Sequence, residues 1–467
     1  MLWIGLALAL FVVLVGFILF REAGRPPKAV AWIAIQFLFP YVGFIAYLLL
    51  GKDYMGNMYA SAEEERKWAM IRGKLADRGR SLAAADETEA FPDARLGASL
   101  RSLTPFPVSH ANNVKVFTEG QAAFEDMFSA IAAARHHIHA EFYIIRNDEL
   151  GNEFMRLLAQ KACEGVKVRL LYDGIGCLRF RQTWLERLPG VETACFFPPV
   201  FALFRGAINF RNHRKIVVVD GKVGFFGGLN IGDEYVGKHP KLGFWRDTHF
   251  RLEGDAVRWI QYTFLTDWHF ITGRLIAGDE YYPEPDRAGA ERVQIVKSGP
   301  DRPMLDLLFA CMAAAKRRIY VETPYFIPDP AIRLALTTAA KSGIDVRIIV
   351  PSRPDHRFVH RASLSYAAEL ARAGVRFYAY NKGFIHSKVV IVDDLACSGS
   401  ANMDIRSFSG QFELNAVFYD RPTVERLTVD FFTDLRDSSE LTADMLERRT
   451  FGQRIGERVA RLVSPML

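Results

Sequence analysis

The sequence predicts an α/β fold of two similar lobes, each a mixed β-sheet flanked by helices. A hairpin of two transmembrane helices is predicted to precede the lobes. Three observations indicate this fold: two uncharged apolar runs open the chain, two later halves repeat each other, and helical and strand periods alternate in each half. With 467 residues, 50% of them hydrophobic and 24% charged, the chain is too long for one ordinary domain and too apolar for disorder.

The two apolar runs at the start of the chain, residues 1–20 and 29–50, contain no charged residue. At about 1.5 Å per residue, each spans roughly 30 Å, the thickness of a bilayer's hydrocarbon core. A cleaved signal peptide is the alternative for the first run, but it has no basic leading segment and no small-x-small cleavage site, and a second run follows at once. We therefore predict a transmembrane hairpin within residues 1–52, with Pro40 interrupting the second span.

Residues 53–110 are charged and helix-prone, then rich in proline, and are predicted to connect the hairpin to the lobes. The formal net charge of +6 suits an anionic partner, either lipid or nucleic acid, and does not choose between them. The five cysteines include no C-x-x-C pair, so neither a disulfide framework nor a zinc site is indicated. Unpaired thiols favour the cytoplasmic side for the lobes.

The lobes are predicted at residues 111–295 and 296–467, because segments of the first recur in the second. Residues 132–141, the end of an Ala-rich helix and the strand after it, match residues 313–322. Residues 165–172, a glycine helix end followed by a buried strand, match residues 343–350. The second lobe also includes a C-terminal helix, whose apolar residues at helical spacing suit either packing on the lobe or contact with an anionic membrane.

Each lobe carries one H-x-K-x-x-x-x-D motif, in segments at about 207–234 and about 380–407. The motif residues are His213, Lys215, Asp220, His386, Lys388 and Asp393. On a strand, the histidine and lysine share a face because they are two residues apart, whereas the aspartate, at an odd offset, points to the opposite face. We therefore interpret the two aspartates as anchors of the strand rather than as proton carriers.

Small residues, an asparagine and an acid follow each motif in the same order. The first lobe supplies Gly227, Gly228, Asn230 and Asp247, and the second supplies Gly399, Ser400, Asn402 and Glu413. A single H-x-K pair would also occur by chance on a solvated edge strand. Two copies with the same residues downstream indicate paired halves of one catalytic site.

The residue types indicate phosphoryl chemistry. Lysine ammonium and asparagine amide groups converging from both motifs suit the oxygens of a phosphate. Two imidazoles provide a nucleophile and a proton donor near neutral pH, and Asp247 and Glu413 could accept the other ring N–H and fix each tautomer. Because these donors already neutralise the phosphate, no metal or other cofactor is expected. The prediction is a two-step phosphodiester exchange through phosphohistidine.

The duplicated motif followed by G-[GS]-x-N resembles the phospholipase D superfamily and, within it, the bacterial cardiolipin synthases. The segments that carry the closer likeness are RNHRKIVVVDGKVGFFGGLNIGDEY, GFWRDTHFRLEG, ETPYF, SANMDIRS and ARLVSPML. The resemblance implies two phospholipase D-like lobes whose motifs meet at their interface, and reversible transfer of a phosphatidyl group between two phosphatidylglycerols, giving cardiolipin and glycerol. It also implies the bacterial inner membrane as the location and anionic phospholipid as the partner. We assign His213 as the nucleophile and His386 as the acid.

Alternative functions share these motifs. A phospholipase D-type hydrolase would pass the phosphatidyl group to water, and another phosphatidyltransferase would pass it to a different alcohol. A membrane-anchored nuclease would need a basic channel and stacking aromatics, and a non-catalytic scaffold would have lost a histidine or lysine. The sequence leaves open a homo-oligomer and the role of the apolar segment at residues 196–204. His136, His137 and His139 are interpreted as structural, because the second lobe has Arg317, Arg318 and Tyr320 there.

Overall fold

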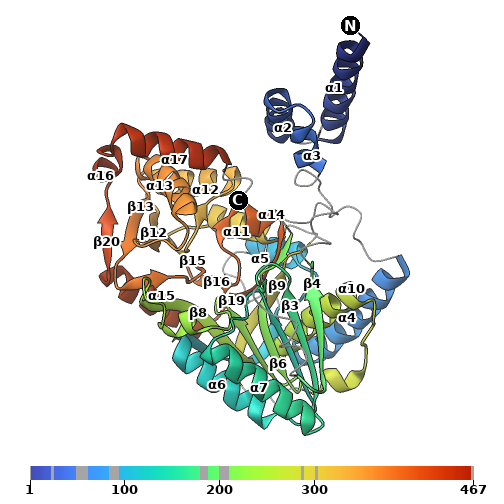
Figure 1. The fold of residues 1–467 in the computed structure, drawn as a ribbon. Coiled ribbons are helices and arrows are strands. Elements are labelled where there is room, and N and C mark those ends of the chain that lie inside the picture. Colours follow the sequence, from blue (N-terminus) through green and yellow to red (C-terminus); the bar gives the residue numbers. More distant parts are fainter. Residues whose placement is uncertain are drawn as a thin grey trace. The chain divides into compact units, whose positions relative to one another are not determined.

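The structure is a computed structural model of the chain (Figure 1). It describes residues 2–22, 26–48, 62–83, 94–178, 188–198, 210–284, 289–299 and 303–463. The chain forms two compact units. One contains residues 1–59 and 197–211, and the other contains residues 60–196 and 212–467. Most of the apolar segment at 196–204 and the first part of the predicted connector lie outside the described residues.

In the unit that contains the N-terminus, the described residues form helices α1 (Leu2–Arg21), α2 (Pro26–Leu38) and α3 (Val42–Ala46). Helix α2 ends just before Pro40, whose ring prevents the regular helix from continuing, as the sequence predicts. Trp32 and Tyr47 are buried in this unit with ring centroids 5.5 Å apart. Within the described part of the chain, no helix combines the length and the apolar character needed to cross a bilayer. The loop at residues 23–25 and the end of the second predicted span lie outside the described residues.

The larger unit is built on one mixed sheet of sixteen strands in the described residues. The N-terminal half contributes β1 (Ser109–Glu119), β2 (His137–Phe142), β3 (Lys167–Asp173), β4 (Val191–Phe196), β6 (Lys215–Val219), β7 (Val223–Gly227) and β8 (Phe244–Glu253). The C-terminal half contributes β9 (Glu291–Lys297), β10 (Arg318–Glu322), β12 (Asp345–Pro351), β13 (Arg376–Tyr380), β14 (Gly383–Ile385), β15 (Val389–Val392), β16 (Leu395–Gly399), β19 (Leu414–Phe418) and β20 (Ser438–Leu441). Two short strands, β11 (Phe326–Ile327) and β17 (Met403–Asp404), pair separately.

The two halves repeat the same strand pairing. In the first, β2 pairs in parallel with β3 and antiparallel with the motif strand β6. In the second, β10 pairs in parallel with β12 and antiparallel with the motif strand β15. The internal repeat expected from the sequence is therefore present in the backbone topology.

The prediction of a separate sheet in each half needs correction, because the two halves share one sheet. Strand β1 pairs antiparallel with both β8 and β9, and β9 continues to β19. Strand β14 of the second half also pairs in parallel with β8 of the first. Joining the halves in this way removes exposed sheet edges, whose unpaired N–H and C=O groups would otherwise remain open to other chains.

Helices cover both faces of this sheet (Figure 1). In the first half, α6 (Gly120–Ala133) and α7 (Glu149–Cys163) cover one face, and α10 (Val257–Thr272) covers the other with part of α4 (Ala62–Ala83). The side chains of strand β6 require cover on both faces of the sheet. Val217 and Val219 pack with α6 and α7, whereas Ile216 and Val218 pack with α10. This alternation follows from the two-residue period of a strand buried on both faces.

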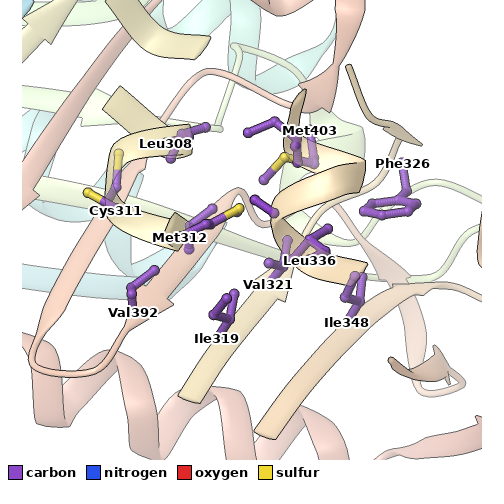
Figure 2. Close-up of a cluster of buried hydrophobic side chains, with 14 of the residues drawn as sticks. Leu308, Cys311, Met312, Ile319, Val321, Phe326, Leu336, Ile348, Val392 and Met403 are labelled. Atoms are coloured by element: carbon purple, nitrogen blue, oxygen red, sulfur yellow. The ribbon is translucent and has the colours of Figure 1, made fainter. Parts of the chain in front are cut away.

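The second half is built the same way. One face is covered by α11 (Pro303–Ala313), α12 (Pro330–Lys341) and α13 (Arg357–Ala371). The same layer includes α5 (Ala94–Leu103), α16 (Ala443–Glu447) and α17 (Phe451–Val463). The other face is covered by α15 (Arg421–Arg436). Figure 2 shows Ile319 and Val321 of β10 beside Met312 and Leu336 of the covering helices. These layers hold the motif strands rigidly in the interior.

Candidate active site

The two motif histidines lie just before their strands, where the halves meet. Strand β6 begins at Lys215 and β15 begins at Val389, so the sequence prediction of histidine and lysine within one regular strand is wrong. The histidine backbones bond across to the other half instead. The N–H of His213 donates to the Phe412 carbonyl at 2.9 Å, and that of His386 donates to the Arg246 carbonyl at 2.7 Å.

Each histidine is paired with a carboxylate from the opposite half. His213 Nδ1 lies 3.0 Å from both carboxylate oxygens of Glu413, and His386 Nδ1 lies 2.7 Å from Oδ2 of Asp247. Both carboxylates are almost fully buried. An ionised carboxylate facing Nδ1 keeps the proton on that nitrogen and leaves Nε2 with a free lone pair. Each histidine is thus ready for chemistry at Nε2 only when both halves are present.

The motif lysines repeat one geometry. The ammonium of Lys215 donates to the His213 carbonyl at 2.6 Å, and that of Lys388 donates to the His386 carbonyl at 2.6 Å. Burial lowers the pKa of Lys215 to about 7 and that of Lys388 to about 8, against the opposing attraction of Glu413 and Asp247. An incoming phosphate would favour the charged form of both, because it returns a negative charge to a desolvated ammonium.

The imidazoles are also shifted. Burial, together with the lysine charges, lowers the pKa of His213 to about 4, and burial and Lys388 lower that of His386, while the facing carboxylates oppose both shifts. Burial alone would raise the pKa of Glu413 and Asp247, but the histidines and lysines facing them hold both carboxyl groups below their ordinary pKa. At neutral pH a neutral His213 therefore faces an ionised Glu413, the state that a nucleophile requires.

The motif aspartates lie at the far ends of the motif strands, in left-handed turns. Asp220 has φ +53° and its carboxylate accepts the backbone N–H groups of residues 135–137 at 2.8–2.9 Å. Asp393 has φ +50° and accepts those of residues 316–318 at 2.7–3.0 Å. These contacts tie the end of each motif strand to the turn that leads into the neighbouring strand, β2 in the first half and β10 in the second. They support the interpretation of the two aspartates as anchors.

The small residues after each motif make room for the carboxylates. A Cβ on Gly228 would lie 1.9 Å from Oδ1 of Asp247. At the equivalent place in the second half, Ser400 uses its hydroxyl to donate to Glu413 at 2.6 Å. A side chain at residue 228 would therefore push Asp247 away from His386.

We expect Gly228→Ala to lower the catalytic rate constant about 10²-fold, because a displacement of about 1 Å in a positioning group costs that much. Steady-state kinetics of the purified full chain would measure it. Gly73→Ala, on α4 where a Cβ has nothing within 4 Å, is the matched control and should keep the full rate. An unchanged rate in Gly228→Ala would mean that Asp247 does not need its observed position.

A cavity of about 540 Å³ opens beside the histidines. Of the sequence-predicted residues, His213, His386, Asn230 and Asn402 line it. Asn230 accepts the Ile144 N–H at 3.0 Å and donates to the Tyr235 hydroxyl at 3.0 Å, which fixes its side chain, whereas no partner for Asn402 Oδ1 is found among the described residues. Both motifs therefore contribute to a single cavity.

The sequence reasoning missed two tyrosines in this cavity. The ring of Tyr143 lies 5.1 Å from that of His213, with the Lys215 ammonium 5.4 Å from its centroid. Tyr325 also lines the cavity and donates a hydrogen bond to Asp355, another lining residue. The matched segments end at Glu141 and Glu322. Tyr143 follows the first glutamate by two residues and Tyr325 follows the second by three, so extending the comparison of the two halves would have found both tyrosines.

His136, His137 and His139 take no part in the cavity. His137 and His139 are fully buried beside Gln261, and His139 stacks on Phe264 with centroids 4.5 Å apart. Burial lowers the pKa of both. They belong to the packing between β2 and α10, in agreement with the structural interpretation.

Comparisons with known proteins point to one family. The family model described as "Cardiolipin synthase, PLD-like domain" matches residues 127–253 and 308–435, and that described as "Phospholipase_D-nuclease N-terminal" matches residues 6–52. The chain is 42% identical to cardiolipin synthase of Geobacillus thermodenitrificans, covering 100% of this chain and 95% of that protein. It is 43% identical to cardiolipin synthase 2 of Bacillus cereus (97% and 90% covered) and 37% identical to the Staphylococcus aureus cardiolipin synthase (96% and 93%).

Among solved structures, phosphatidylserine synthase of Haemophilus influenzae matches with a TM-score of 0.60 over 80% of this chain and 100% of that one. The identity is 14%, so this likeness concerns the fold. It agrees with the α/β fold of two phospholipase D-like domains described above.

Proposed function

The chain belongs to the cardiolipin synthases with phospholipase D-like domains, and from this membership we propose how its residues divide the reaction. It is a phosphatidyltransferase that acts on phospholipid and makes cardiolipin. The observation that carries the assignment of roles is the crossed pairing of His213 with Glu413 and His386 with Asp247 around one cavity.

In the first step, Nε2 of His213 attacks the phosphorus of one phosphatidylglycerol. A P–N bond forms, the P–O bond to the glycerol headgroup breaks, and His386 gives its proton to the departing oxygen. The products are phosphatidyl-His213 and free glycerol. The proton that His386 supplies is favoured by Asp247 and by the negative charge of a bound phosphodiester, both of which oppose the burial that lowers the pKa of this imidazole. The pKa of about 4 keeps His213 unprotonated.

In the second step, His386 takes the proton from a headgroup hydroxyl of a second phosphatidylglycerol. The oxygen of that hydroxyl attacks the phosphorus and the P–N bond breaks. Cardiolipin leaves, and both histidines return to their starting states. The buried ammonium groups of Lys215 and Lys388 and the amides of Asn230 and Asn402 stabilise the phosphate oxygens in both steps. Because glycerol can attack the same phosphohistidine in place of the second phosphatidylglycerol, the exchange is reversible.

The assignment of His213 as nucleophile is tested with a nitrophenyl phosphodiester, whose leaving group needs little help from an acid. We expect His386→Ala to keep a measurable burst of nitrophenol because the phosphohistidine still forms, and His213→Ala to give none. Stopped-flow absorbance would measure the burst. The opposite pattern would exchange the two roles.

The acceptor separates this proposal from its alternatives. Purified protein supplied with phosphatidylglycerol alone is expected to yield cardiolipin and glycerol in equal amounts, with little phosphatidic acid. Phosphatidic acid as the main product would indicate a hydrolase. Cleavage of single-stranded or double-stranded DNA that depends on His213, with no phosphatidyl transfer, would indicate a nuclease.

We also propose that residues 1–52 hold the enzyme in the bacterial membrane as a transmembrane hairpin, with the catalytic part on the cytoplasmic side. Support comes from the uncharged runs at 1–20 and 29–50 and from the match of the N-terminal family model to residues 6–52. We expect deletion of residues 1–50 to leave the rate in mixed micelles nearly unchanged and to reduce the rate on intact vesicles, because tethering raises the local substrate concentration. An equal loss in both formats would contradict a purely anchoring role.

A further inference from the structure

Helix α17 presents a row of large apolar side chains outward. Phe451, Ile455 and Val459, spaced four residues apart on one side of the helix, are 73%, 46% and 49% exposed. Among the α17 side chains that the structure describes, the buried ones are Glu457 and Ala460, on the other side. An amphipathic helix that packs on its own protein does the reverse, burying the apolar stripe and exposing the charges. The outward stripe of Phe451, Ile455 and Val459 is therefore suited to contact outside this chain's core.

Polar contacts, rather than the apolar stripe, hold α17 in place. Arg461 pairs with Glu369 of α13, and its guanidinium lies 4.2 Å from the centroid of the Tyr366 ring. Glu457 pairs with Arg449 ahead of the helix. The charged side chains on the inner side of α17 therefore have partners within the chain. These contacts hold the helix in its orientation while the stripe stays exposed.

Helix α13 connects α17 with the catalytic cavity. Gly456 packs against Arg361 and Arg461 pairs with Glu369, so α17 runs parallel to α13, and the two lie side by side in Figure 1. The residues at the start of α13, including His356 and Val359, line the cavity. The N-terminal end of the stripe therefore lies at the same end of α13 as the cavity.

Positive charge accompanies the stripe. Arg454 and Arg458 lie one residue before Ile455 and Val459 and are exposed to solvent. An apolar stripe bordered by arginines is the arrangement of a helix that lies in the interface of an anionic bilayer, with apolar side chains at the headgroup boundary and guanidinium groups on phosphates.

We propose that α17 docks on the surface of a bilayer containing anionic phospholipid and brings the cavity rim to the lipid headgroups. The delivery of substrate to the cavity rests on the proposed function, whereas the docking itself does not. The contact is separate from the N-terminal hairpin and fixes the orientation of the catalytic unit on the membrane.

The test places an environment-sensitive fluorescent amino acid at residue 455 or at residue 453 of the full chain. Gln453 is exposed on the same helix but lies off the stripe, which makes it the matched control site. The chain carries His213→Ala, so that lipid is not consumed and docking is measured apart from turnover. Proteoliposomes contain phosphatidylcholine with or without phosphatidylglycerol, and brominated acyl chains act as quenchers.

The expected result is quenching at residue 455 at least about threefold stronger than at residue 453, falling by half or more without phosphatidylglycerol. Equal quenching at the two residues would overturn the proposal. A blue shift at residue 455 without quenching would also overturn it, because protein, either a second copy or the N-terminal helices, would then cover the stripe.

A second measurement uses the active chain. Ile455→Glu should lower transfer on phosphatidylglycerol vesicles about tenfold and leave the rate in mixed micelles unchanged, since only the vesicle surface needs docking. Gln453→Glu adds the same charge and keeps the acceptor that receives the Thr450 N–H at 2.9 Å, so it should match the parent in both formats. If Ile455→Glu lowered the rate equally in micelles, the variant would have a structural defect and docking would be overturned. If residue 455 were quenched as expected but the active chain showed no phosphatidyl transfer in either format, docking would stand and the proposed function would be rejected.

Discussion

Replacing either His213 or His386 with alanine is expected to lower the phosphatidyl transfer rate by about 10³-fold or more. Each imidazole lines the same cavity, and each is oriented by a carboxylate from the other half of the chain. Neither half therefore contains a complete catalytic set. Radiolabelled phosphatidylglycerol in mixed micelles, with cardiolipin separated by thin-layer chromatography, would measure the loss.

The control for these variants is His356→Ala, which makes the same change at a largely exposed histidine on the cavity rim. It should keep most of the rate, because its side chain pairs with neither Glu413 nor Asp247. Thermal unfolding of all three variants would verify that they are folded. A single mutant retaining half of the activity would show two independent sites and reject the shared one.

Exchanging the positioning carboxylates for amides is expected to produce the second largest loss, about 10²- to 10⁴-fold for Asp247→Asn and for Glu413→Gln. The amide keeps the size of the side chain, but its NH₂ group can donate to Nδ1 and thereby favours the tautomer with the proton on Nε2. In Glu413→Gln, that proton removes the lone pair with which His213 attacks. In Asp247→Asn, the protonated form of His386 loses its counter-charge.

The two carboxylate variants should also differ from each other. With the nitrophenyl substrate, Asp247→Asn should recover much of its burst because acid assistance is dispensable, whereas Glu413→Gln should remain slow. Glu253→Gln is a suitable control, since it removes a carboxylate from the same strand as Asp247 in a partly exposed pair with Arg251. If Asp247→Asn lost the burst and Glu413→Gln kept it, each carboxylate would serve the histidine of its own half.

Local pattern was enough to predict the repeated helices and strands and to select the candidate residues. The histidines, lysines and asparagines stand at similar offsets in both halves and one acid follows each set, so the repeat itself distinguishes these residues from ordinary polar residues. The contacts of Asp220 and Asp393 agree with their interpretation as anchors, but the physical reason differs from the expected one. Both lie away from the cavity because they follow the far ends of β6 and β15, in left-handed turns.

Long-range pairing was beyond that reasoning. Nothing within residues 207–234 indicates that the His213 ring will meet Glu413, because the contact depends on how one half packs on the other. The single sheet was missed for the same reason, since the β1–β9 pairing joins strands 184 residues apart at Ser109 and Val293. The histidines lie outside the regular strands because their backbone N–H groups donate to carbonyls of the opposite half of the chain.

The crossed carboxylates also bear on the synthesis of the enzyme. A ribosome delivers His213 and Asp247 well before His386 and Glu413, so a nascent chain with only its first half folded holds each of its catalytic groups without the proper partner. Such a chain is expected to be inert toward the lipids around it until β19 has taken its place beside β9 and carried Glu413 to His213. Catalysis therefore begins only when the polypeptide is complete, and a truncated product that ends before Glu413 is expected to have no activity on phospholipid.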